Sequence, residues 1–245
     1  MFYYGFDWTY ILVLIGAVFS MIASAKVNST FQKYAKVRSM SGMTGAQVAR
    51  RILDRNGLSN IPIEHVRGNL SDHYDPSARV LRLSDSTYNS PSVAAIGVAA
   101  HECGHAIQHN EGYAPLKLRT AIVPAANLGS KLGIPIILLG VLFGGGGSFL
   151  INIGIWVFSL AVLFQIVTLP VEFNASNRAL AILENYGILG QQENQHAKKV
   201  LSAAAMTYVA AAASSILQLL RLVILFGGCR KLYKKLFGRN HKCKT

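Results

Sequence analysis

The sequence predicts a mainly α-helical protein in which several membrane-crossing helices are joined to a small α+β domain. Only 14% of the 245 residues are charged, whereas about 25% is usual in a soluble domain. Uncharged apolar runs cover residues 8–25, 132–171 and 200–220, and a run of about 18 such residues is long enough to cross a bilayer. Between the first two runs lies a polar stretch in which two strand-like patterns precede a helical one.

The first apolar run is predicted to be an uncleaved anchor, so that residues 1–27 form an N-terminal transmembrane segment. Ala23-Ser24-Ala25 resembles a signal-peptide cleavage site, but the residues before the run contain neither Lys nor Arg, and a signal peptide begins with a basic region. Basic residues instead follow the run, beginning at Lys26. Because basic residues favour the cytoplasmic side, we expect residues 28–117 to be a cytoplasmic catalytic segment.

Within this polar segment, one helix and two strands are predicted before the main motif. Residues 44–56 have an amphipathic pattern with Thr44 as the N-cap and Gly57 as the stop. Residues 61–66 and 79–83 alternate apolar and polar side chains, as half-buried strands do. A turn-rich connection, residues 69–76, is expected between the two strands.

The most informative motif is His101-Glu102-Cys103-Gly104-His105. A helix is predicted around it, with Ser90 as N-cap, Pro91 in the first turn and Gly112 closing the end. Positions i and i+4 share one helix face, so both imidazoles can bind a single metal ion, and the intervening glutamate can act as a base. A small sheet before an H-E-x-x-H helix is the order found in zincin peptidases. A helix with two incidental histidines is disfavoured, because buried polar side chains are costly without partners.

A transmembrane hairpin is predicted over residues 118–170. Residues 132–143 alone would span only about 18 Å, so the second span must begin near Ala121 and include Lys131. The third span is expected to end at Pro170, which returns the chain to the side of the membrane that carries the motif.

Glu172 is the best candidate for a third metal ligand. A tetrahedral zinc ion held by two histidines needs one more protein ligand and an open position for water. We expect a separate helix to begin at Pro170 and residues 171–199 to form it, with Glu172 in its first turn. The alternative is a glutamate that only stabilises the helix N-terminus through the helix dipole.

The last apolar segment, residues 200–228, is predicted to be either a membrane-associated helix or a fourth transmembrane helix. The first option is favoured, because a fourth span would place the basic tail, residues 229–245 with seven Lys and Arg, outside the cell. The net charge of +13 does not indicate nucleic-acid binding, because the basic residues flank the apolar runs and no aromatic-basic motif accompanies them.

Several segments together resemble a known family. HECGHAIQH, followed by LPVEFNASNRAL, with DHYDP upstream and AMTYVAAA downstream, is similar to the YugP-type neutral zinc metallopeptidases of bacterial membranes. The likeness extends over nearly the whole chain, and a more distant one links it to membrane gluzincins such as HtpX and the CAAX prenyl proteases. The resemblance implies that Glu172 is the third ligand. Where the distant relatives have an aspartate, this chain has Ser176, so the partner of the ligand set could be Asn174, Ser176 or Asn177.

Motif and resemblance lead to one functional hypothesis: a zinc metalloendopeptidase of the bacterial cell membrane, multi-pass, with its active site facing the cytoplasm. His101, His105 and Glu172 would bind one Zn²⁺ per chain, and Glu102 would take a proton from the zinc-bound water. The second donor to the oxyanion is left open among Tyr208, His73, Tyr74, His109 and Arg178. Substrates would be peptides or membrane proteins, and the lipid bilayer is the other expected partner. The alternatives are a catalytically inactive zinc-binding scaffold and a transporter, which the intact Glu102 and the few polar residues in the spans respectively disfavour.

Overall fold

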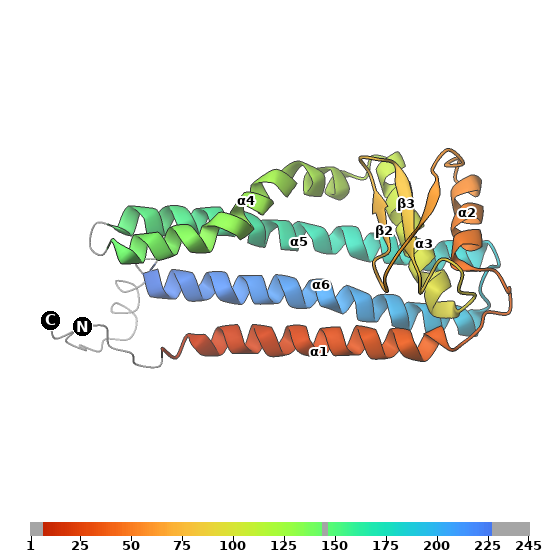
Figure 1. Ribbon diagram of the computed structural model, residues 1–245, viewed down its shortest axis with the longest axis horizontal. Coiled ribbons are helices and arrows are strands. Elements are labelled where there is room, and N and C mark those ends of the chain that lie inside the picture. The colour runs from red at the N-terminus through yellow and green to blue at the C-terminus, as the bar shows by residue number, and fades with distance from the viewer. Residues whose placement is uncertain (1–6, 144–146, 227–245) are drawn as a thin grey trace. The chain divides into compact units, whose positions relative to one another are not determined.

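The computed structural model describes residues 7–143 and 147–226 and is mainly helical (Figure 1). Its helices are α1 (Tyr10–Ala35), α2 (Gly45–Arg55), α3 (Val93–Asn110), α4 (Ala114–Leu142), α5 (Ser148–Asn185) and α6 (Gln191–Phe226), and its strands are β1 (Ile63–Val66), β2 (His73–Asp75) and β3 (Val80–Ser84). The predicted fold class, long apolar helices with a small sheet that precedes the motif helix, is confirmed. The predicted basic tail lies outside the described residues.

Four of the described helices, α1, α4, α5 and α6, are long and apolar enough to cross a membrane. Many large apolar side chains on them are exposed, a pattern that suits lipid rather than water. On α1 these are Ile11, Leu14, Ile15, Val18, Met21 and Ile22. The sequence favoured a membrane-associated helix over a fourth span at the C-terminal end, and α6 has the length that either arrangement requires.

The chain divides into two compact units, and the first comprises residues 1–20, 121–166 and 210–245. In its described part, α1 meets α6 through a serine whose hydroxyl, Ser214 Oγ, donates to the Gly16 carbonyl at 2.9 Å and lies 3.0 Å from Ser20 Oγ. Small residues and hydroxyl groups of this kind allow apolar helices to pack closely where the hydrophobic effect gives little help.

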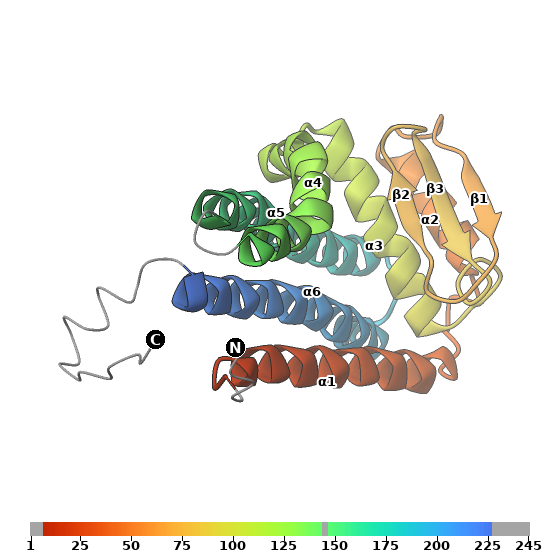
Figure 2. The same ribbon diagram turned by 60° about the vertical axis from the view of Figure 1, so that its left-hand side comes forward.

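The second unit, residues 21–120 and 167–209, contains the sheet. β3 lies between the other two strands, parallel to β1 and antiparallel to β2 (Figure 2). β2 falls within the stretch that the sequence predicted to be only a turn-rich connection, and that prediction was wrong. The side chain of Asp75 accepts hydrogen bonds from the backbone of Ser77 and Ala78, and Arg79 has a φ of 52°. This tight turn folds a three-residue strand back onto β3, and three residues are too few to give an alternating pattern.

α2 begins and ends where the sequence predicts. Thr44 is its N-cap and forms a capping box with Gln47, in which each side chain accepts from the other residue's backbone N–H. Gly57 follows the helix with a φ of 71°, a conformation that glycine adopts without strain.

α3 starts two residues later than predicted, because the N-cap is Ser92 rather than Ser90. The Ser92 side chain accepts from the Ala95 backbone N–H at 3.2 Å. The backbone before it is extended and pairs with another segment: Ser39 N donates to the Pro91 carbonyl, and Val93 N donates to the Val37 carbonyl. These tertiary hydrogen bonds hold residues 90–92 out of the helix.

α5 does not end at Pro170, as the sequence predicted, but continues without a break to Asn185. A proline inside a helix removes one backbone hydrogen bond and crowds the preceding turn. Packing compensates here, because Val171, Ala175 and Ala179 on the following turns are fully buried. The membrane-length segment and Glu172 therefore belong to one continuous helix.

The core of the second unit holds α3 tightly against its neighbours. Side chains from α2, β3, α3, α5 and α6 form one buried cluster, and α3 comes close to α5 at Gly104. A Cβ atom on Gly104 would lie 2.7 Å from the Ala175 carbonyl oxygen, whereas the nearest atom to one on Gly97 would be the Ala197 Cβ, at 3.3 Å. The backbone of Ala197 would lie at 3.7 Å or more, so only the first position has a backbone atom closer than van der Waals contact allows.

We predict that Gly104→Ala lowers the free energy of unfolding by about 1–3 kcal/mol, because the methyl group must push α3 away from α5. Gly97→Ala on the same helix is the matched control. There the contact is looser and alanine favours the helix by about 1 kcal/mol, so we expect stability close to that of the unmodified chain. Thermal unfolding of the detergent-solubilised protein measures both, and equal midpoints for the two variants would contradict the prediction.

Candidate functional site

The two histidines of the motif lie one turn apart on α3 and face the same side. Their ring centroids are 4.7 Å apart, with the ring planes nearly perpendicular. Each imidazole side chain is 13% exposed, so the pair is largely shielded but still reached from a cavity. The i, i+4 spacing of the sequence therefore places both rings as the motif requires.

Glu172 on α5 approaches both rings with one carboxylate oxygen. Glu172 Oε2 lies 3.3 Å from His101 Nε2 and 3.5 Å from His105 Nε2, and the carboxylate is only 4% exposed. The three side chains offer ligand atoms that all lie within 4.8 Å of one another, the only such group in the described part of the chain. The structure thus brings together the three residues that the sequence selected as ligands.

This arrangement fits a metal ion better than it fits a hydrogen-bonded cluster. Glu172 Oε2 is buried and has no hydrogen-bond partner among the described residues, although two imidazole nitrogens are near it. In a tetrahedral zinc site with bonds of about 2.0–2.1 Å, neighbouring ligand atoms are roughly 3.3–3.4 Å apart. The separations from Glu172 to the two nitrogens agree with that spacing. Two imidazoles and a carboxylate also form a donor set that zinc accepts.

The outer nitrogen of each imidazole is held by a side chain that the ligand set does not include. Ser176 Oγ lies 3.1 Å from His101 Nδ1, and Gln108 Oε1 lies 3.0 Å from His105 Nδ1. Where the sequence left Asn174, Ser176 and Asn177 open as partners, the structure places the Ser176 hydroxyl beside a ligand. Gln108 was missed, although its position three residues after His105 puts it on the same helix face.

The orientation of the Gln108 amide can be deduced from its contacts. Its Nε2 donates to the Val171 carbonyl and to Asn174 Oδ1, both at 2.9 Å, so its oxygen must face His105. An amide oxygen can only accept a hydrogen bond. Nδ1 of His105 therefore carries a proton, and in the neutral imidazole the lone pair is on Nε2, which faces Glu172. This is the tautomer that a metal ligand needs.

Glu102 lies in the same cavity, on the other side of the motif from Cys103. The carboxylate is 8% exposed, and its Oε2 accepts a hydrogen bond from the Tyr74 backbone N–H at 3.0 Å. β2, the strand that the sequence did not predict, supplies this N–H. Cys103 points into the core beside the Ala49 carbonyl, where burial raises the pKa of its thiol and keeps it neutral.

The cavity in front of the cluster has a volume of about 250 Å³. Its polar lining residues are Asp72, His101, Glu102, Glu172, Ser176, Thr207 and Tyr208, and the other lining residues are apolar. Apolar walls lower the local dielectric and strengthen the electrostatic effects of the polar groups.

Of the five residues considered as oxyanion donors, Tyr208 alone lines this cavity in the described structure. His73 and Arg178 have other partners: His73 Nδ1 bonds the Ser71 carbonyl, and Arg178 pairs with Glu111 at 2.7 Å. Tyr74 and His109 bond each other at 2.8 Å, and partial burial raises the pKa of the Tyr74 phenol. No sequence pattern indicated Arg119 on α4, whose Nη1 lies 3.4 Å from Glu172 Oε1.

Comparisons with known proteins found a matching family and a similar protein. Residues 9–227 match a protein family described as "Putative neutral zinc metallopeptidase". A Bacillus subtilis (strain 168) protein named "Putative membrane protease YugP" is 51% identical over 218 residues, which cover 89% of this chain and 96% of the relative. No solved structure matches the chain.

We predict that Gln108→Ala weakens zinc binding about 10- to 100-fold, because His105 loses the acceptor that fixes its tautomer and ring orientation. Gln192→Ala, at an exposed position at the start of α6, is the matched control and should bind zinc as the unmodified chain does. Titration with zinc against a fluorescent chelator measures both affinities without any substrate. Equal affinities for the two variants would show that Gln108 does not orient a ligand.

Proposed function

We propose that this chain, which belongs to the neutral zinc metallopeptidase family, is a membrane-embedded zinc metalloendopeptidase that acts at the cytoplasmic face. The proposal rests on one observation. His101, His105 and Glu172 lie together, and the buried Oε2 atom of Glu172 has no hydrogen-bond partner among the described residues. Glu102 opens into the same cavity. A structural metal site has no need of such a carboxylate, whereas hydrolysis needs a base beside the metal.

The three ligands would hold one zinc ion. When bound, the ion would supply Lewis acidity that lowers the pKa of a coordinated water to near 7 and polarises the substrate carbonyl. His101 and His105 would present Nε2, and Glu172 would present Oε2. Ser176 and Gln108 would keep both rings in the required orientation through the outer nitrogens.

Glu102 would accept the proton of the attacking water and later return it to the leaving amine. The Tyr74 N–H fixes one oxygen of its carboxylate, which leaves the second oxygen to exchange the proton. Tyr208 is the side chain best placed to donate a hydrogen bond to the developing oxyanion, because its side chain shares the cavity with Glu102 and the ligands.

The sidedness of the site is inferred from charge. Lys26 follows the first apolar run, Lys33 lies farther along the same helix, Lys36 directly follows the helix, and all three are exposed. Lys and Arg beside a span mark its cytoplasmic end. The catalytic unit continues directly from this end of α1, so the cavity would open to the cytoplasm.

The central test compares the unmodified chain with Glu102→Gln. We expect both to bind one zinc ion per chain, because Glu102 is not a ligand. We expect peptide hydrolysis to fall about 100- to 10,000-fold in the variant, because the base is lost while shape and hydrogen-bonding capacity are largely kept. Zinc content by elemental analysis and cleavage of a quenched fluorescent casein measure the two quantities on detergent-purified protein.

Tyr208→Phe in the same assay separates the oxyanion donor from the base, since it should lower kcat with zinc content and KM little changed. Zinc in every chain with hydrolysis in none, across a panel of denatured membrane-protein substrates, would count against the peptidase and in favour of a zinc-binding scaffold.

For sidedness, we predict that Met40→Cys is labelled only from the cytoplasmic side. Met40 lies in the loop between α1 and α2 and is 92% exposed. Cys229 and Cys243 would first be replaced by serine, whereas Cys103 is buried and should not react. A membrane-impermeant maleimide added to intact cells should fail to label the variant and should label it after the membrane is opened. Labelling of intact cells would place the site on the outer face.

A further inference from the structure

A second cavity of the catalytic unit lies between α1 and α6 and is lined by lysines. It has a volume of about 800 Å³. Lys26 and Lys33 come from α1, and Lys198 and Lys199 come from α6. We propose that this lysine groove binds the phosphate headgroup of an anionic phospholipid.

The charges in the groove have no counter-charge. No Asp or Glu lines it, and no ion pair in the described part of the chain involves any of the four lysines. The Nζ atom of Lys33 lies over the Tyr34 ring, 5.5 Å from the ring centroid, and this contact does not neutralise its charge. Like charges around one cavity repel each other, so an anion placed among them is attracted by all of them.

The hydroxyl groups around the lysines suit a phosphate. Ser29 and Thr30 on α1 and Ser202 on α6 line the same groove. Ammonium groups attract the charge, and hydroxyl groups can donate to the remaining phosphate oxygens. The Ser29 hydroxyl donates to the Lys26 carbonyl at 3.1 Å and would turn from it to reach a phosphate.

The position of the groove along the two helices favours a lipid over a soluble anion. Lys26 directly follows the uncharged run of residues 8–25, and Lys199 directly precedes the uncharged run of residues 200–220. Both helices therefore pass from charged to apolar sequence at the groove, which is the level at which headgroups meet acyl chains. Met206, farther along α6, lines the groove and is 42% exposed, so it offers an apolar surface to a chain.

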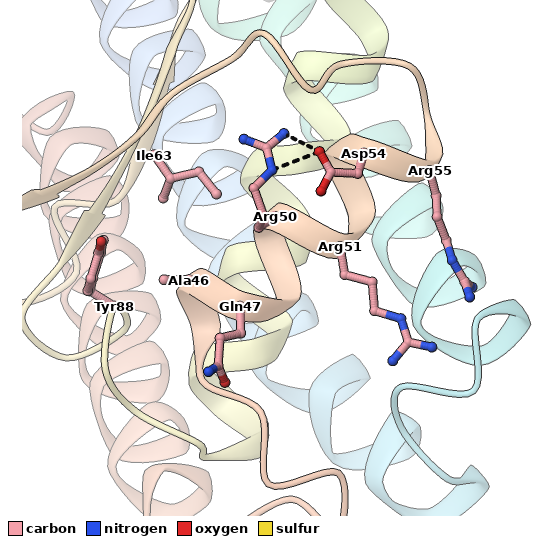
Figure 3. A pocket seen from close by; sticks show the side chains of 8 residues that line it. All are labelled: Ala46, Gln47, Arg50, Arg51, Asp54, Arg55, Ile63 and Tyr88. Carbon is pink, nitrogen blue, oxygen red and sulfur yellow. Dashed lines mark hydrogen bonds and ion pairs between the residues drawn. The ribbon is translucent and has the colours of Figure 1, made fainter.

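A groove on α2 shows what distinguishes the lysine groove (Figure 3). It has a volume of about 640 Å³ and is lined by Arg50, Arg51 and Arg55. Here the cations have partners: Arg50 pairs with Asp54 at 2.9 Å, and the Arg55 guanidinium lies 4.7 Å from the centroid of the Tyr186 ring. No uncharged apolar run adjoins α2. This groove therefore supplies a control in which the same number of charges can be removed at a different place.

The test uses the full-length protein in a neutral detergent and follows its thermal unfolding midpoint as phosphatidylglycerol is added. All chains carry Glu102→Gln, so that the result does not depend on peptidase activity. We expect phosphatidylglycerol to raise the midpoint, in proportion to its occupancy, and phosphatidylcholine to raise it far less. In Lys198→Gln/Lys199→Gln the apparent Kd should rise about 25-fold, roughly fivefold for each lysine removed. Arg51→Gln/Arg55→Gln, with the same loss of charge, should keep the original Kd.

Four results would overturn the proposal. Equal weakening in the lysine and arginine variants would mean that net charge alone attracts the lipid. Loss of binding in Lys198→Arg/Lys199→Arg, which keeps both charges, would mean that charge is not the determinant. An equal rise in midpoint with inorganic phosphate would assign the groove to a free anion, and an equal rise with soluble polyglutamate would assign it to an acidic protein segment.

Discussion

The close approach of α3 to α5 is the constraint on which the group of three candidate metal ligands depends. The two histidines and the glutamate are separated by 67 positions in the chain, from His105 to Glu172, and only helix packing brings them together. The two helices are in close contact at Gly104, inside the motif itself, where the α5 backbone occupies the place of a side chain. A bulkier residue there would move the carboxylate away from both rings. The glycine of the pentad thus serves geometry, while its neighbours serve chemistry.

Burial of the Glu172 carboxylate has a free-energy cost that the residues around it must offset. Removing an ionised carboxylate from water costs several kcal/mol unless partners compensate. Arg119 approaches one oxygen, and the other faces two imidazoles that it does not hydrogen-bond. The amide network of Gln108 requires a proton on the outer nitrogen of His105, so the inner nitrogen of the neutral imidazole can offer its lone pair to a cation. A cation between the three ligand atoms would satisfy the carboxylate and both imidazoles at once.

Sequence reasoning found the features that are encoded locally. The capping box of α2 and the i, i+4 histidines depend on residues within a few positions of one another, and both lie where they were predicted. What it missed depends on distant contacts. Ser90 is as good a cap as Ser92 by composition, and pairing with residues 37–39 decides between them. Pro170 is a strong helix breaker locally, but packing after it keeps α5 continuous. Arg119 gains its role only from α5, so no pattern near it could have revealed that role. Gln108 could have been suspected from its i+3 spacing to His105, but its contacts with α5, which orient its amide, could not.

The origin of the ligands on separate helices also sets an order of events during synthesis. A growing chain that has reached Val171 already contains the complete H-E-x-x-H pentad but lacks the residue that closes the ligand set. Two imidazoles alone hold zinc weakly, and Tyr208, which completes the cavity wall, is made later still. The three candidate ligands therefore cannot meet until α5 has been made and has packed against α3.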